Sequence, residues 1–328
     1  MTPAYEIFIE DENITSRFQD RLISLNISLQ SNGTSDECRI IVEDSQKKLS
    51  VPDKGILLNI QMGYTGKLWQ MGSFIVDSIR LKGTPDSVEI VANSGAFVNN
   101  PIYAAIGSYK DRSWGTITLG ELVKAIALED KLDYKISPDL SGETLKDAHQ
   151  TKESDFNFLH RNVRNKDGYT KIQSGVIIVS KNATTLTAGT GSQMPIFTIT
   201  PNMVSEWDVL LSDTHKFKMA SADWHDFNTA TRKRETAGSG TPTYICPLLY
   251  PSQEEAQAAA EGGLTNFSRR GNQLTLTMPG KTEITPECQL VLSGFRDGVD
   301  GQWASKQVEH SLSRSGFTTK IIAETLQQ

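Results

Sequence analysis

The sequence lacks the features that mark membrane, secreted and disulfide-stapled proteins. It has 3 cysteines in 328 residues, and Cys38, Cys246 and Cys288 lie too far apart in the sequence to form a CxxC site. So few cysteines favour a reducing compartment. No apolar run approaches the roughly 18 residues that cross a bilayer, and the acidic, alternating N-terminus is typical of a strand, not of a signal peptide. We therefore expect a soluble cytoplasmic product with no membrane partner.

An excess of positive charge is also absent. The 33 lysines and arginines are outnumbered by 39 aspartates and glutamates, which gives a formal net charge of -6. Nucleic-acid recognition normally requires a basic face, so no specific nucleic-acid partner is expected. The basic run Arg232-Lys233-Arg234 lies in residues 231–243, a polar, Gly-rich stretch that predicts a mobile loop. A solvated surface is the favoured interpretation of this run.

Motifs for metal binding and nucleotide binding are missing. Apart from His225, the histidines are scattered, with no HExxH or paired spacing, at positions His149, His160, His215 and His310. Residues 189–192 read Gly-Thr-Gly-Ser but lack the following lysine and helix of a phosphate loop, so they are interpreted as a linker. We predict no metal-binding and no cofactor-binding residues.

One cluster could suggest catalysis. Strand alternation places Asp223 and His225 on one face and Asp226 on the other, which is a poor arrangement for convergent chemistry, so a structural role is favoured. Glu153 and Asp155 flank the start of a predicted helix, where carboxylates favour the positive end of the helix dipole. A glycosidase pair requires carboxylates on opposing walls of a cleft, and nothing in the sequence selects such a pair. We predict no catalytic residues.

The chain is long enough for two or three domains, and strand patterns dominate both ends. In residues 1–95, apolar and polar residues alternate in several runs, as in residues 22–29 and 56–64, which predicts an antiparallel barrel or sandwich. A hairpin turn is expected at residues 31–34, followed by a partner strand over 36–44. This first β-domain is predicted to end near residue 95.

Residues 96–200 are predicted to form a small α+β domain. Thr118 and Glu121 form a capping box ahead of a helix with apolar residues at helical spacing. A second helix begins after the N-cap Ser154 and is expected to end before Gly168, followed by a hairpin that turns at residues 174–175.

Residues 201–328 are predicted to form a second β-domain. A short Ala-rich helix is expected at 252–261, capped by Ser252 and Glu255 and ended by Gly262-Gly263. The fold class is therefore α+β, mainly β, with two antiparallel β-modules and a small middle domain.

The two β-domains share a series of landmarks that indicates an internal duplication. In each, a proline precedes an apolar strand that ends in glycine and an aromatic, and two further glycines delimit the next strand. The matched landmarks are Pro52 and Pro286, Gly63-Tyr64 and Gly294-Phe295, Gly72 and Gly301, Phe74 and Trp303, and Gly83 and Gly316. Two unrelated β-meanders could share this punctuation, and that alternative stays open here. A trimer of a two-module chain would present six similar units.

The ordered motifs resemble the phage late control protein D family over nearly the whole chain. The motifs that carry the resemblance are PAYEIFIEDENIT, RLISLNIS, VPDKGILLNIQMGY, TGKLWQMGSFIVDSI, ESDFNFLHRNVRNKDGY, SADWHD, EEAQAAAE and GQWASKQVEHSLSRSGFTTKI. One departure is Pro286-Glu287-Cys288, where the family pattern leads us to expect a glycine-containing turn. Residues 231–243 fall in a variable region of the family, to which nothing is carried over.

The resemblance implies a baseplate hub protein of a contractile phage tail or a phage-like bacteriocin, related in fold to the hub part of the VgrG spike. It implies a homotrimer whose tube-type β-domains form a pseudo-sixfold ring between a sixfold tail tube and a threefold spike. The implied partners are the tube protein, the spike protein and, with them, tape measure and baseplate wedge proteins. The implied location is the tail baseplate of the virion, assembled in the cytoplasm of a host bacterium.

Two other classes of function remain as alternatives. A tail-associated cell-wall glycosidase is the first, and a carbohydrate-binding β-protein is the second. Because the sequence shows no fibrous composition after the last predicted strand, we expect the needle to be a separate polypeptide. The leading hypothesis is a structural, non-enzymatic hub.

Overall fold

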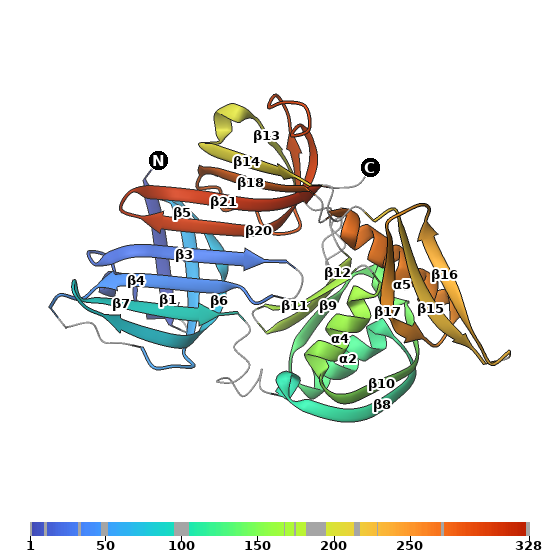
Figure 1. Ribbon diagram of the computed structural model, residues 1–328. Coiled ribbons are helices and arrows are strands. Elements are labelled where there is room, and N and C mark those ends of the chain that lie inside the picture. The colour runs from blue at the N-terminus through green and yellow to red at the C-terminus, as the bar shows by residue number, and fades with distance from the viewer. Residues whose placement is uncertain are drawn as a thin grey trace.

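The computed structural model describes residues 2–9, 12–31, 34–46, 52–94, 105–166, 168–173, 175–181, 195–212, 217–227, 229–269 and 272–325. Two β-modules lie side by side, and an α+β middle domain and a smaller unit of strands and one helix lie next to them (Figure 1). Within these described residues, no helix combines the length and apolar character that crossing a membrane requires.

The first β-module is built from alternating strands around one core. Its elements are β1 Pro3–Ile9, β2 Glu12–Asn13, η1 Thr15–Arg17, β3 Leu22–Gln30, β4 Glu37–Glu43, β5 Leu57–Tyr64, β6 Lys67–Lys82 and β7 Ser87–Asn93. In β3, Leu25 and Ile27 are completely buried while Ser24, Asn26 and Ser28 between and beside them are partly exposed. Such alternation puts one face of a strand into the core and leaves the other in water.

The second β-module has its own core and includes the last strands of the described residues. Its elements are β13 Ile196–Ile199, η2 Pro201–Met203, β14 Glu206–Leu211, β18 Asn272–Pro279, β19 Gln289–Leu292, β20 Gly301–Ser313 and β21 Gly316–Thr325. Buried Leu276, Trp303 and Ile321 lie in its core. β13 belongs to this sheet although the predicted boundary at residue 200 assigned it to the middle domain, because it pairs in register with β19.

The two modules share one order of strands within a single sheet, which has 13 strands in the described part of the chain. The order is β3-β4-β7-β6-β5-β1 in the first module and β14-β18-β21-β20-β19-β13 in the second, which matches the elements one to one along the chain. A 3-10 turn precedes the equivalent strands β3 and β14. Two strands differ: β2 has no counterpart among the strands described in the second module, and β1 runs antiparallel to β5 whereas β13 runs parallel to β19. The internal duplication indicated by the sequence therefore extends to the whole module.

The backbone details of the modules agree as well. The pairing of β6 with β7 slips by one residue between Val76 and Ser78, and that of β20 with β21 slips between Ser305 and Gln307. β-Bulges of this kind bend a strand and change its pairing partner. Both long strands therefore pair with one neighbour before the bulge and are free to meet another after it.

The turn ahead of β5 and β19 resolves the departure noted at Pro286-Glu287-Cys288. Gly55 has a φ of 87°, and Glu287 at the equivalent position has a φ of 64°. The Gly55 N–H donates to the Val76 carbonyl at 2.8 Å, and the Glu287 N–H donates to the Ser305 carbonyl at 2.7 Å. The turn is the same in both modules, and a glutamate adopts the left-handed backbone that favours glycine.

The middle domain packs its helices on small sheets. Its elements are β8 Tyr109–Thr118, α2 Leu119–Glu129, β9 Asp133–Ile136, α3 Pro138–Ser141, β10 Thr144–Ser154, α4 Asp155–Arg164, β11 Gly168–Gln173 and β12 Val176–Lys181. The predicted caps are confirmed: the Glu121 N–H donates to Thr118 Oγ1 at 3.2 Å, and the Asn157 N–H donates to Ser154 Oγ at 3.2 Å. α4 ends at Arg164, so Gly168 starts the next strand and is not the stop signal of the helix.

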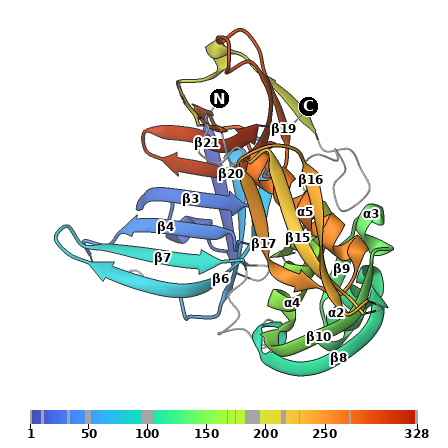
Figure 2. The ribbon, with the colours of Figure 1, turned by 45° about the vertical axis from the view of Figure 1, so that its right-hand side comes forward.

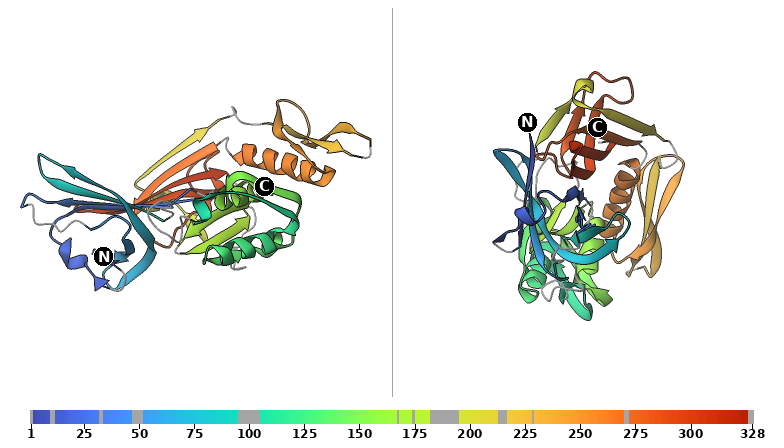
Figure 3. Two further views of the ribbon diagram at one scale, coloured as in Figure 1. Left: turned by 90° about the horizontal axis from the view of Figure 1, so that it is seen from below. Right: turned by 90° about the vertical axis from the view of Figure 1, so that its left-hand side faces the viewer.

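A separate unit interrupts the second module between β14 and β18. It comprises β15 Met219–Asp226, β16 Thr231–Gly238, β17 Thr243–Tyr250 and α5 Gln253–Arg269, and we call it the inserted unit. Its small core is rich in alanine and distinct from that of the module around it. Residues 201–328 therefore do not form one continuous β-domain. Figures 2 and 3 show α5 between its own strands and the middle domain.

Two local predictions for the inserted unit are wrong. The helix expected at 252–261 starts as predicted, with the Glu255 N–H donating to Ser252 Oγ at 3.3 Å, but it continues through Gly262-Gly263. Gly263 faces β17, since a Cβ there would lie in ordinary contact with the Tyr244 ring, at 3.5 Å. Residues 231–238 form β16 and not a mobile loop, because they pair along their whole length with β15.

Some predictions fall on residues outside the described ranges. They include the centre of the 31–34 turn, residue 174 of the 174–175 turn, His215 and the stretch 189–192. These stay predictions.

Candidate functional site: the junction between the two β-modules

The two modules are joined by main-chain pairing of β3 with β20. The pairing is antiparallel and covers seven residue pairs, from Gln30 opposite Gln307 to Ser24 opposite Ser313 (Figure 1). At its end the Ser31 N–H donates to the Lys306 carbonyl at 2.9 Å. Because β20 is the equivalent of β6, the edge of one module is completed by a strand of the other.

Side chains on the outer face reinforce this pairing. Ser311 Oγ donates to Asn26 Oδ1 at 2.6 Å, and Gln307 Nε2 donates to Ser28 Oγ at 3.2 Å. Cross-strand polar pairs of this kind contribute some tenths of a kcal/mol each, up to about 1 kcal/mol.

The inner face of the junction contains a buried histidine. His310 is completely buried, and its Nδ1 lies 2.9 Å from Thr319 Oγ1. Burial lowers the pKa of His310 to about 4, against smaller opposing effects from the Ile284 backbone and the charge of Glu283. The imidazole is therefore neutral near pH 7 and acts as a polar core residue.

An aromatic contact tightens the same junction. The Tyr64 hydroxyl donates to the Gly280 carbonyl at 3.0 Å, and the rings of Tyr64 and Phe317 meet edge to face with centroids 5.6 Å apart. A Cβ on Gly280 would lie 2.0 Å from the Phe317 ring, so no side chain fits there. The modules are thus held at a fixed spacing.

The middle domain is tied to this junction by a buried ion pair. Lys171 Nζ lies 2.7 Å from Asp36 Oδ1 and donates to the Gln30 carbonyl at 3.0 Å. Burial raises the pKa of Asp36 despite the opposing effect of Lys171. A cavity of about 210 Å³ lies where the three units meet, lined by residues of both modules and of the middle domain, including Leu29, Tyr169 and Thr285.

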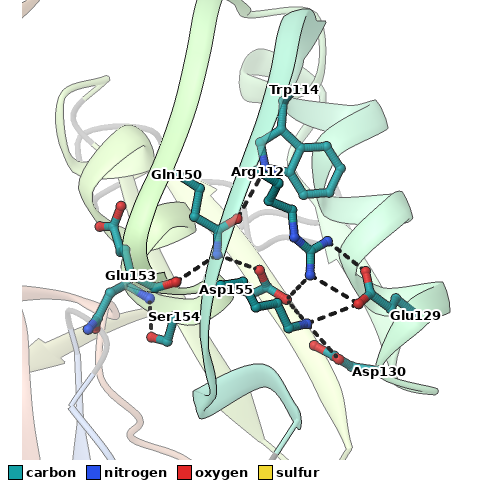
Figure 4. A network of polar contacts seen from close by, with 10 residues as sticks. Arg112, Trp114, Glu129, Asp130, Gln150, Glu153, Ser154 and Asp155 are labelled. Atoms are coloured by element: carbon teal, nitrogen blue, oxygen red, sulfur yellow. Dashed lines mark hydrogen bonds and ion pairs between the residues drawn. The ribbon is translucent and has the colours of Figure 1, made fainter.

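A charged network lies inside the middle domain (Figure 4). Lys110 Nζ lies 2.5 Å from Asp155 Oδ2 and 3.1 Å from Glu129 Oε1, and Arg112 binds both oxygens of Glu129 at 2.7 and 3.0 Å. Gln150 Nε2 donates to Asp155 Oδ1 at 2.7 Å. These contacts connect β8 and β10 to the end of α2 and the start of α4.

The carboxylates of this network could in principle hold a metal ion. Ligand atoms of Glu129, Asp130 and Asp155 lie within 4.8 Å of one another. Hydrogen bonds from Arg112 lower the pKa of Glu129 to about 2 although burial opposes this, and burial raises the pKa of Asp130. The ammonium of Lys110 reaches all three carboxylates, at 3.5 Å or less, and so supplies the positive charge that a metal would bring. These ion pairs join β8 to the end of α2 and the start of α4.

The predicted cluster at residues 223–226 consists of two separate ion-pair sets. Asp223 is bound by Arg232 at 2.5 Å and by Arg234 at 2.6 Å, while Asp226 is bound by Lys233 at 2.6 Å. Hydrogen bonds from Arg234 and then Arg232 outweigh burial and lower the pKa of Asp223 to about 2. The three basic residues thus hold β16 on β15, and each carboxylate is already engaged.

The other residues considered from the sequence do not converge. Glu153 binds Arg161 at 3.0 Å, and Asp155 belongs to the charged network. His149 is exposed, and His160 stacks on Phe156 with ring centroids 6.1 Å apart. The sequence reasoning missed Lys110, Arg112 and the Asp36–Lys171 pair, because each partner lies on a different element and no local pattern connects them.

The chain is similar in sequence to baseplate hub proteins of phages. No protein-family model matches the sequence. The sequence is 26% identical to a probable baseplate hub protein of Escherichia phage 186, over 99% of this chain and 93% of that protein. It is 25% identical to the probable baseplate hub protein of Escherichia phage P2, with the same coverage.

Solved structures share the fold at low sequence identity. A 43 kDa tail protein of prophage MuSo2 from Shewanella oneidensis superposes with a TM-score of 0.73 and 10% identity, covering 98% of both chains. A tail protein from Neisseria meningitidis gives 0.73 and 12%, covering 99% of this chain and 97% of that one. A component of the type VI secretion system of E. coli gives 0.55 and 11%, covering 94% and 74%. The resemblance seen in the sequence motifs is confirmed: this chain is a homologue of the baseplate hub proteins of phages.

Proposed function

We propose that this protein is the structural baseplate hub of a phage tail, or of a phage-like bacteriocin, and that it works as a homotrimer. The observation that carries the proposal is the repeated module, with one strand order occurring twice in a single sheet. A ring of three such chains presents six similar modules while keeping threefold symmetry. Such a ring can meet a sixfold tube on one side and a threefold spike on the other.

Closed cyclic symmetry satisfies every equivalent interface, which supports a ring over an open chain. The exposed edge strand β14 also supports association of subunits, because unpaired edges of sheets invite association. The partners proposed are the tail tube protein, the spike protein and other baseplate and tape measure proteins. The names of the homologues support association with other tail proteins and a location in the tail baseplate. Assembly in the cytoplasm of the host is part of the proposal.

The proposed role is structural and not enzymatic. Asp223 and Asp226, the carboxylates closest to a catalytic arrangement in the sequence, are each engaged by basic residues of β16. We expect no turnover of purified peptidoglycan by the protein. Release of soluble fragments that is lost in Asp223→Asn or Asp226→Asn would contradict this role and favour the glycosidase alternative.

Light scattering on the purified protein, alone and with its tube and spike proteins, tests the assembly. We expect the mass of three chains, and electron microscopy of particles carrying a labelled chain should place the label between tube and spike. A stable monomer in the presence of both partners would contradict the proposal and favour the carbohydrate-binding alternative.

A further inference from the structure

We propose that β14 of one subunit pairs antiparallel with the second half of β6 of the neighbouring subunit. This contact would repeat, between chains, the pairing of β3 with β20 inside each chain. The inference rests on the trimer proposed above and adds the strands and the register that join its subunits.

The first half of this contact is the free edge of β14. Within the described residues, β14 pairs with β18 alone and ends the sheet. The register runs Leu25–Ile40–Ile90–Ile79 across the first module and Trp207–Leu276–Ile321–Val308 across the second. Trp207 is thus the equivalent of Leu25, and Leu211 is the equivalent of Leu29.

The exposure of β14 is what β3 would show without β20 beside it. Leu25 is 0% exposed and Leu29 is 5% exposed, whereas Trp207 is 40% and Leu211 is 57% exposed. Leu210 on the other face is 58% exposed. A short edge strand with this much exposed apolar surface is a pairing site.

The second half of the contact is the distal part of β6. β5 pairs with β6 only as far as Ile75, and the bulge at Asp77 follows. Beyond it, none of the strands described lies against β6 on the β5 side, although the equivalent part of β20 pairs there with β3. Leu81 in this part of β6 is 71% exposed. A cavity of about 410 Å³ adjoins it, lined by Leu81, Gly83 and Val88 among others.

The duplication also fixes the register of the proposed pairing. Ile79 is the equivalent of Val308, which pairs with Leu29, so Ile79 meets Leu211 of the next subunit. Counting along both strands, Leu81 meets Val209 and Lys82 meets Asp208. Ile79, Leu81, Val209 and Leu211 then lie on one face of the new ladder, and Leu210 lies on the other face opposite Arg80.

The polar face is complementary in charge. Lys82 stands where Ser311 stands in β20, and Asp208 stands where Asn26 stands in β3, so the Ser311–Asn26 hydrogen bond would be replaced by an ion pair. Around Lys82, the carboxylate of Glu89 already meets three cations, at 2.7 Å from Lys82, 3.0 Å from Arg39 and 3.8 Å from Arg80. Arg80 and Lys82, the two cations of this group on β6 itself, have side chains that are 72% and 47% exposed, which favours an acidic strand beside them, and β14 carries both Glu206 and Asp208.

Disulfide cross-linking tests the strands and the register together. Directly opposed residues in an antiparallel pair have Cα atoms about 4.5–5.5 Å apart, within disulfide range. In the full-length protein, Leu81→Cys with Val209→Cys should give covalent dimers and trimers on a non-reducing gel after mild oxidation. The matched control, Lys67→Cys with Val209→Cys, uses the far end of β6 and should stay largely monomeric. Each single variant controls for the native cysteines, which are buried.

A charge reversal gives a second readout without cysteines. Asp208→Arg should raise the trimer dissociation constant at least about tenfold. Asp139→Arg, an exposed site on the middle domain, makes the same charge change and should leave trimer stability unaltered.

The outcomes separate this inference from the proposed function. A trimer by light scattering whose Leu81–Val209 cysteine pair links no better than the control pair overturns the strand pairing and leaves the hub role standing. A protein that is monomeric in light scattering contradicts the hub role itself. An unchanged trimer in Asp208→Arg overturns the charge complementarity at this contact.

Discussion

The two β-modules have the same backbone plan but opposite surroundings. In the first, the edge strand β3 is buried by β20 of the second module, and in the second, the equivalent edge strand β14 is exposed. A duplicated unit normally uses equivalent edges in equivalent ways. Of the two equivalent edges, one is covered inside the chain and the other is uncovered among the described residues, and the strand pairing proposed above would cover it.

The modules also show which features are conserved between copies within one chain. The bulge, the turn at Gly55 and Glu287, and the hydrogen bonds of that turn are the same. The side chains at equivalent positions differ: Phe74 in the first module corresponds to Trp303 in the second. Backbone geometry therefore defines the module, and each core has been repacked around it.

The largest effect should come from truncating the central aromatic of each module. Phe74 and Trp303 are both 1% exposed, so Phe74→Ala and Trp303→Ala should each lower the free energy of unfolding by about 3–5 kcal/mol. Trp303→Ala should lower the free energy of unfolding more than Phe74→Ala. The Trp303 Nε1 donates to the Val299 carbonyl at 2.9 Å, and this buried acceptor would lose its donor. Urea unfolding followed by circular dichroism measures both.

Exchanging these two residues sharpens the comparison. Trp303→Phe should cost about 1–3 kcal/mol through the lost hydrogen bond, and Phe74→Trp should cost about 1–3 kcal/mol through overpacking beside Gly72, whose Cβ position lies 3.2 Å from the Phe74 ring. If either alanine variant lost less than about 1 kcal/mol, the two cores would not be equivalent.

A smaller effect, dependent on pH, is expected at His310. Its pKa of about 4 in the folded protein lies below the unfolded value of about 6.5, so the unfolded chain binds more protons between these pH values. The contribution of the neutral imidazole is present in full above about pH 6.5 and is lost as the pH falls toward 4, by about 3 kcal/mol in total. Unfolding free energies measured from pH 7.5 to 4.5 test this.

The position equivalent to His310 in the first module is occupied by Leu81, so leucine is the substitution chosen for His310. His310→Leu should flatten the pH dependence in this window. A slope that persists in His310→Leu would show that other groups produce it.

The smallest effect is expected at the shared turn. Because Gly55 has a φ of 87°, Gly55→Ala should destabilise the first module by about 1 kcal/mol. Gly55→Asn should cost less, since asparagine tolerates the left-handed region. Equal stability of wild type and Gly55→Ala in thermal unfolding would show that the turn relaxes.

Local features of the fold were predictable from the sequence, and long-range joins were not. Alternation in β3 and the caps at Thr118 and Ser154 depend on neighbours within a few residues, so the sequence carries them directly. The pairing of β3 with β20 joins residues far apart in the chain, and only the duplication hinted at it. The charged residues of β16 led to the prediction of a loop. Only the fold shows that they bind Asp223 and Asp226 on the neighbouring strand.

The candidate site was predictable only in outline. The repeated landmarks indicated two modules. They could not show that the edge strand β3 is covered and β14 is not, because this depends on how the two modules dock. The predicted end of the helix at Gly262-Gly263 was wrong, because a glycine pair often ends a helix, whereas α5 continues through both glycines and packs on its own sheet.

The seven residue pairs between β3 and β20 have a mechanical consequence. A force directed along these strands shears all the hydrogen bonds of the ladder at once, so they share the load. A force that lifts one strand end away from the other opens them one after another, and each bond then bears the load alone. The junction between the modules should therefore resist sliding far better than peeling, and pulling single molecules from attachment points along and across the ladder would measure that anisotropy.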